Sequence, residues 1–166
     1  TSGETRSNAV MFTAIEGTTY LISVDGEYGA TGDIALHLSF TYNFSTLAGL
    51  AGTSGTANGT GTAARFNRLN ASAPDNLGNV YVADLNNHAI RKVAADGTVT
   101  TLAGSPGTSG YTNATGTAAR FNTPSGIVVA PDGNIYVADG SNHAIRKITP
   151  AGVVTTFAGA TTATTG

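Results

Sequence analysis

Large apolar and polar residues alternate along the first part of the chain, and this period of two predicts β-strands with one buried face. The longest alternation covers residues 34–42, and its apolar members are Ile34, Leu36, Leu38, Phe40 and Tyr42. Two shorter alternations lie over residues 10–14 and 20–24, and turn-forming glycines separate the three stretches. We therefore expect an N-terminal antiparallel sheet over residues 1–43. Because three strands cannot supply both layers of a sandwich, the longest strand is a candidate assembly strand for contact with another chain.

From residue 44 onward the sequence repeats itself with a constant offset of 55 residues and no gap. The segment Tyr-Val-Ala-Asp occurs at 81–84 and 136–139, and Asn-His-Ala-Ile-Arg-Lys occurs at 87–92 and 142–147. A period of this length is typical of solenoids, propellers and arrays, in which one unit cannot bury its apolar face without a neighbour. Two copies are too few to close a ring.

Each copy contains four short apolar stretches joined by tight turns, which predicts a four-stranded propeller blade. In the second copy the expected strands cover residues 126–130, 135–139, 144–148 and 153–158. The first strand of the first copy instead contains the weak segment Ser72, Ala73 and Pro74. Since proline cannot donate to a ladder, we expect this strand to lie at an edge or to be irregular.

A long loop rich in glycine, serine and threonine precedes the first strand of each copy. Loops of this length usually carry a function or are packed by their own side chains. We expect these loops to be anchored to the sheets by Arg65, Phe66, Arg120 and Phe121.

The pattern at residues 79–92, with its second occurrence at 134–147, resembles the NHL repeat, and the resemblance extends over residues 44–159. It implies propeller blades that serve mostly as binding platforms, while a minority of the family are lyases or hydrolases. Residues 8–42 resemble the closing strands of a bacterial pre-peptidase C-terminal-type β-sandwich. The expected fold is therefore all-β: a partial sandwich at 1–43, two NHL-type blades at 44–98 and 99–159, and a Thr-rich tail at 160–166. This chain is not expected to form a closed propeller on its own.

Composition narrows the classes of function. Only 11% of the residues are charged and the formal net charge is −2, so the chain lacks the basic stripe of a nucleic-acid binder. It contains no cysteine, and no apolar run approaches the roughly 18 residues that a membrane-spanning helix needs. Abundant threonine and glycine with little lysine indicate an exported bacterial protein, located outside the cell or at its surface.

The polar side chains most capable of chemistry recur in both copies. They are Tyr81, Asp84, His88 and Arg91, with the counterparts Tyr136, Asp139, His143 and Arg146. We interpret them as structural, because a catalytic site is normally unique, and we expect each aspartate to pair with the arginine of the next strand. Asn87 and Asn142 are expected to hold the intervening turn by adopting a left-handed conformation. We expect no catalytic residue, no metal site and no cofactor, since two histidines are too few for the metal centre of the family's lyases. The segment 132–134 could suggest calcium, but its spacing does not match an EF-hand loop.

Three hypotheses of function remain. The first is a non-enzymatic extracellular structural protein whose copies complete one another's blades or strands, in a ring or a filament. The alternative is a fragment of a larger exported propeller whose loops at 50–64 and 105–119 bind a glycan or a protein. The third is an enzyme fragment of the lyase type. The expected partners are other copies of the chain, with a glycan or protein ligand under the alternative, and neither nucleic acid nor a membrane span is expected.

Overall fold

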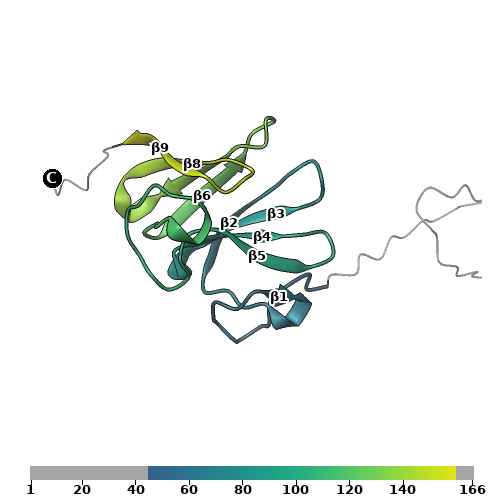
Figure 1. Ribbon diagram of the computed structural model, residues 1–166. Helices are drawn as coiled ribbons and strands as arrows, with labels where there is room; N and C mark the ends of the chain where they lie inside the picture. The colour runs from purple at the N-terminus through teal and green to yellow at the C-terminus, as the bar shows by residue number, and fades with distance from the viewer. Residues whose placement is uncertain (1–44, 160–166) are drawn as a thin grey trace, which may run out of the picture. The chain divides into compact units, whose positions relative to one another are not determined.

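The computed structural model describes residues 45–159, which form two antiparallel β-sheets (Figure 1). The first sheet has five strands in the order β1-β5-β4-β3-β2, and the second has four in the order β6-β7-β8-β9. The predicted all-β fold, with two repeat sheets that do not close into a ring, is confirmed. The predicted N-terminal sheet, its candidate strand with Ile34, Leu36, Leu38, Phe40 and Tyr42, and the Thr-rich tail lie outside the described residues.

The strand bounds follow the sequence offset closely. The first sheet contains β1 (Gly59–Thr60), β2 (Leu69–Pro74), β3 (Val80–Asp84), β4 (Ala89–Val93) and β5 (Thr98–Ala103). The second contains β6 (Pro124–Val129), β7 (Ile135–Asp139), β8 (Ala144–Ile148) and β9 (Val154–Gly159). Short 3-10 turns lie at Gly61–Ala63, Leu85–Asn87, Gly116–Ala118 and Gly140–Asn142.

Two details differ from the expected blades. The first sheet gains a fifth strand because Gly59 and Thr60, from the loop before β2, pair with the outer strand β5. The weak segment at the end of β2 nevertheless pairs with β3 through Pro74, and β2 does lie at the sheet edge. The register shift in β2 recurs at the same place in β6, so this irregularity belongs to both copies and not to the weak sequence.

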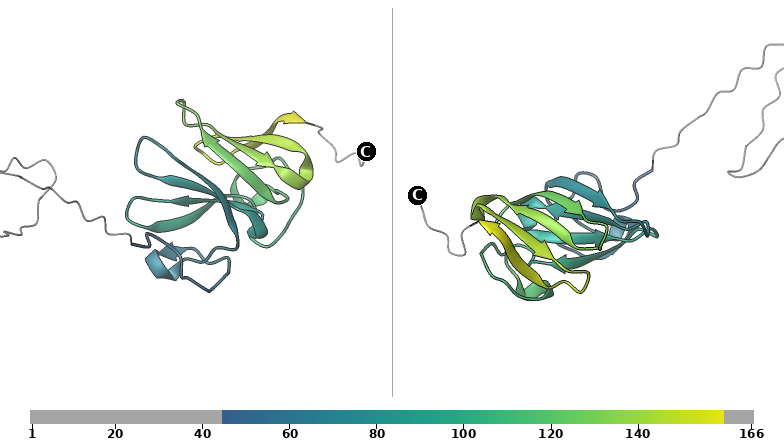
Figure 2. Two further views of the ribbon diagram at one scale, coloured as in Figure 1. Left: turned by 180° about the vertical axis from the view of Figure 1, so that it is seen from behind. Right: turned by 90° about the horizontal axis from the view of Figure 1, so that it is seen from above.

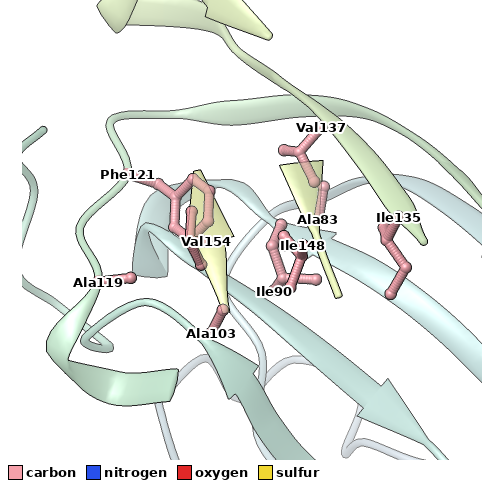
Figure 3. Packing of buried hydrophobic residues seen from close by; sticks show 9 residues of the cluster. All are labelled: Ala83, Ile90, Ala103, Ala119, Phe121, Ile135, Val137, Ile148 and Val154. Atoms are coloured by element: carbon pink, nitrogen blue, oxygen red, sulfur yellow. The ribbon is translucent and has the colours of Figure 1, made fainter. Parts of the chain in front are cut away.

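A shared hydrophobic cluster joins the two sheets (Figure 3). We call the side of the first sheet that contacts the second sheet its front and the opposite side its back, and corresponding sides of the second sheet keep these names. The front of the first sheet packs against the back of the second. The cluster consists of Ala83, Ile90, Ala103, Ala119, Phe121, Ile135, Val137, Ile148 and Val154.

The two sheets lie face to face in the views of Figures 1 and 2, and β2 and β6 are neighbours along one edge. The loop between β5 and β6 crosses from one sheet to the other and places Ala119 and Phe121 inside the cluster, where both are fully buried. The loop is therefore part of the core and not only a connection.

A glycine ends β5 where the chain leaves the first sheet. Gly104 has a φ of +93°, and a Cβ at this position would lie 2.6 Å from the carbonyl oxygen of His88. The corresponding Gly159 has a φ of +99° and the same separation from the carbonyl oxygen of His143. Both the left-handed conformation and the close backbone approach require glycine here.

Gly104→Ala is expected to reduce the free energy of unfolding by more than the roughly 1–2 kcal/mol that a left-handed alanine costs alone. The added methyl must also displace the His88 carbonyl. Gly107→Ala is the matched control, because Gly107 has a φ of +83° and open space around its Cβ position. Urea denaturation measures both losses, and equal losses would contradict the argument from close approach.

Candidate functional site

Each sheet buries one ion pair on its back. In the first sheet, Arg91 Nη1 donates to Asp84 Oδ2 at 2.9 Å, and neither side chain is exposed. Asn87 donates to the same carboxylate oxygen at 2.8 Å. Because β3 and β4 are antiparallel neighbours, Asp84 and Arg91 are brought to the same side of the sheet although they are seven residues apart.

This network fastens the preceding loop to the sheet. Arg91 donates to the backbone oxygens of Arg65 and Ala57 and to Asn58 Oδ1, at 3.0, 2.9 and 2.8 Å respectively. Asp84 Oδ1 accepts the Asn67 N–H at 2.8 Å. The guanidinium also lies 5.2 Å from the centroid of the Phe66 ring, within the range of a cation–π contact. The ionic side chains are thus committed to holding backbone.

The second sheet repeats the arrangement. Arg146 Nη1 donates to Asp139 Oδ2 at 2.8 Å, and both side chains are fully buried. Arg146 also donates to the backbone oxygens of Arg120 and Thr112 and to Asn113 Oδ1. The Nε atoms of both arginines are buried without a hydrogen-bond partner. A network present in both sheets has the character of a scaffold.

The turn between the paired strands differs from the expectation in one respect. The left-handed residues are His88 and His143, each with a φ of 53°, and not the asparagines before them. Asn87 and Asn142 lie in the 3-10 turns, where their buried side chains donate to the network carboxylates and to the carbonyl oxygens of Gly55 and Gly110. Their buried amide groups are therefore needed for hydrogen bonds, which leaves the strained backbone position to the following histidine.

The two histidines have different surroundings. The Nδ1 atom of His88 accepts the backbone N–H of Thr123 at 3.1 Å, across the junction between the sheets. The side chain of His143 is exposed, because no further sheet follows within the described residues. Within residues 45–159, no group of three or more His, Asp or Glu side chains gathers in a way that could hold a metal ion.

The four expected loop anchors act in two ways. The guanidinium of Arg65 donates to the backbone oxygens of Thr62 and Ala64, and that of Arg120 donates to those of Thr117 and Ala119, so both arginines brace their own loop. Phe121 is fully buried between the sheets, whereas Phe66, on the back of the first sheet, is half-buried.

A groove of about 430 Å³ lies between the turn that joins β2 to β3 and the turn that joins β6 to β7. The two turns project at the same end of the described unit (Figure 1). The lining is Pro74, Asp75, Asn76, Leu77 and Tyr81 from the first sheet, and Val129, Ala130, Pro131, Asp132, Gly133 and Pro150 from the second. Sequence reasoning treated both aspartates only as turn residues and missed the groove, because its walls lie far apart in the chain.

Hydrogen bonds hold the carboxylates of the groove in their ionised form. Asn79 donates to Asp75 through its side chain and its backbone, and these bonds lower the pKa of Asp75. The Asn134 backbone and side chain lower the pKa of Asp132 in the same way. The Tyr81 hydroxyl donates to Asp75 Oδ2 at 3.3 Å, while burial and the negative charge of Asp75 raise the pKa of Tyr81. Tyr136, the counterpart of Tyr81, instead packs edge-on against Phe157, with ring centroids 4.9 Å apart.

Arg146→Met is expected to lower the free energy of unfolding by about 3–5 kcal/mol, because it leaves the Asp139 carboxylate buried without its cation. Lys147→Met is the matched control, since Lys147 is adjacent on the same strand and half-exposed. Chemical denaturation of both variants provides the comparison. If Arg146→Met costs no more than Lys147→Met, the pair does not fasten the loop.

Asp75→Asn is expected to lower the pKa of Tyr81 toward its ordinary value of 10.0, because the neighbouring negative charge is removed. Since the folded-state pKa of Tyr81 is raised, its contribution to stability is complete below the unfolded-state pKa. That contribution is lost as the pH rises through the folded-state value, so the loss begins at lower pH in the variant. An NMR titration of the Tyr81 ring measures the shift. Asp96→Asn, in a turn outside the groove lining, is the control and should leave the Tyr81 pKa unchanged.

Known proteins share both the repeat and the arrangement of the sheets. Residues 121–148 match the NHL repeat. Over 69 residues the chain is 41% identical to NHL repeat-containing protein 2 of Homo sapiens, which covers 40% of this chain and 10% of that protein.

Two similar crystal structures come from Bacteroides thetaiotaomicron. One is described as an auxiliary nutrient binding protein, with 30% identity and a TM-score of 0.53 over 66% of this chain and 28% of that one. The other is described as a protein of unknown function, with 30% identity and a TM-score of 0.55 over 61% of this chain and 26% of that one. The chain thus spans about a quarter of each solved structure. It carries an NHL repeat segment within an open, propeller-like pair of β-sheets.

Proposed function

We propose that this chain is a ligand-binding part of a larger, exported, non-enzymatic NHL-type propeller, and that the groove between its two sheets is a binding site. The observation that carries the proposal is the 30% identity and TM-score of 0.53 with a structure described as an auxiliary nutrient binding protein. An extracellular or cell-surface location is proposed from the low charge, the absence of cysteine and the abundance of threonine and glycine.

The groove departs from the repeat, as a specific site should. Asp75 has Ala130 as its counterpart 55 residues later, and Leu77 has Asp132. The repeated ionic groups, by contrast, are buried and hold loops. A function that needs one particular arrangement of side chains is therefore better placed in the groove than in the repeated network.

The chemistry of the groove favours a neutral polyhydroxylated ligand. Its volume of about 430 Å³ falls within the range of small-molecule sites. Asp75 and Asp132 stay ionised at neutral pH and supply acceptors for hydroxyl groups, while no lysine, arginine or histidine belongs to its lining. The proline rings and the exposed side chain of Leu77 offer apolar surface to the C–H face of a sugar ring. We propose a glycan as the ligand.

Self-assembly into a ring or a filament, the principal expectation from the sequence, draws less support from these comparisons. The description of the first similar structure names nutrient binding and does not mention assembly. The absence of catalysis remains a prediction that rests on the repetition of the ionic residues.

Isothermal titration of the full chain with neutral oligosaccharides, using maltohexaose, xylohexaose and cellohexaose as probes, tests the proposal. At least one probe is expected to bind. Asp75→Asn should weaken that binding about tenfold or more, because it removes a charged acceptor worth roughly 1.5–3 kcal/mol. Asp96→Asn, a turn carboxylate outside the groove lining, should leave the affinity unchanged. Absence of binding to every probe, or equal losses in both variants, would refute a glycan site in this groove.

A further inference from the structure

The front of the second sheet is an uncovered copy of a surface that is buried elsewhere in the same chain. Ile145 is 38% exposed, whereas its counterpart Ile90 is fully buried between the sheets. Phe157 is 62% exposed, and its counterpart Leu102 packs against the shared cluster. Val128 and Tyr136 lie on the same exposed side and correspond to Ala73 and Tyr81.

The back of the first sheet is uncovered in the complementary way. Leu69 is 49% exposed, whereas its counterpart Pro124 is fully buried. A hollow of about 420 Å³ on this side is lined by Leu69, Phe66, Val80, Val82 and Val93, among others. The counterparts of these five residues in the second sheet are Pro124, Phe121, Ile135, Val137 and Ile148, all buried.

We propose that the back of the first sheet binds the front of the second sheet of another copy of this chain, and so repeats the contact that joins the two sheets within one copy. The internal interface shows which residues would meet, because every position just named keeps an apolar side chain at its counterpart. Such a contact is heterologous, so it leads to a closed ring or to an open filament according to the rotation between neighbours. This inference does not depend on the proposed glycan site.

A polar contact supports the same pairing. Within the chain, His88 accepts the backbone N–H of Thr123, which has a φ of 50°. The counterparts of these residues are His143, whose side chain is exposed, and Arg68, which has a φ of 60°. Arg68 therefore holds the backbone conformation that presents its N–H to a histidine of a preceding sheet. In the proposed contact, His143 of one copy accepts this N–H from the next copy.

The segment Thr46–Gly49 carries the same implication. Its counterparts 101–104 and 156–159 lie at the ends of the outer strands β5 and β9, yet Thr46–Gly49 joins no sheet. Gly49 donates to Gly61 O at 3.0 Å, as Gly104 donates to Gly116 O at 3.1 Å. The segment thus lies on the first sheet as the outer strand of a preceding sheet does.

A docked copy brings its own β9 to this place, so that β9 or Thr46–Gly49 must move aside. Docking therefore includes the exchange of one segment for its sequence counterpart.

Two exposed positions allow a direct test with the full chain. Leu69→Glu places a charge on the back of the first sheet, and Ile145→Glu places one on the front of the second. Each variant keeps one intact surface, so each alone should sediment as a monomer. An equimolar mixture should give a 1:1 dimer, and the unmodified chain should give larger species that increase with concentration. Val153→Glu is the matched control, because Val153 is 39% exposed but pairs with Thr115 at the outer edge, and it should associate like the unmodified chain.

Sedimentation velocity over the micromolar range distinguishes the outcomes, and circular dichroism verifies that each variant is folded. Ala71→Glu, on the same hollow, replaces Leu69→Glu if that variant does not fold. An unmodified chain that stays monomeric at all concentrations overturns the proposal and assigns these surfaces to other parts of the chain or to further sheets. A mixture that fails to form the dimer also overturns it, as does a Val153→Glu variant that loses association.

Discussion

In each sheet one buried guanidinium holds a loop that has little else to hold it. The loops before β2 and β6 consist mainly of glycine, threonine, serine and alanine, so they bury few apolar atoms of their own. Arg91 and Arg146 supply donors in a fixed planar arrangement to backbone oxygens in the loop, while an aspartate on the neighbouring strand balances the charge. Removing two charges from water is costly, and the network offsets that cost by satisfying several backbone groups at once.

The junction between the sheets depends on this anchoring. The loop that Arg146 holds contributes Ala119 and Phe121 to the cluster between the sheets, and the Phe121 ring lies 5.2 Å from the guanidinium. A displaced loop would therefore withdraw two of the cluster's members and expose Ile135 and Ile148. Local electrostatics and the packing of one sheet on the next are coupled through one arginine.

The same geometry separates scaffold from site. Because the aspartate, asparagine and arginine are consumed in both sheets by the loops, the groups that looked most reactive in the sequence are buried and paired. Side chains free to meet a ligand lie at the turns, where the two copies differ, as at Asp75 and Ala130. The sidedness of the sheets has a second consequence, since the uncovered back of the first and the uncovered front of the second match the two halves of the internal interface.

How far the sequence determined the structure can be judged from individual residues. The alternation of apolar residues and the turn at 131–134 specified the strands of the second sheet to within about two residues, because strand and turn preferences act over short distances. The repeat also indicated the pairing of Asp84 with Arg91, since antiparallel neighbours bring these positions together. It misplaced the left-handed residue, because only the folded network shows that the Asn87 amide is needed as a buried donor while His88 takes the strained backbone.

The sequence by itself determined the all-β repeat, the strand positions and the incompleteness of two copies. The tertiary structure alone decided the path of the loops through the core, the groove between turns about 55 residues apart, and which side of each sheet stays uncovered. The physical reason is that these features arise from contacts between segments distant in the chain, which no local pattern of residues encodes.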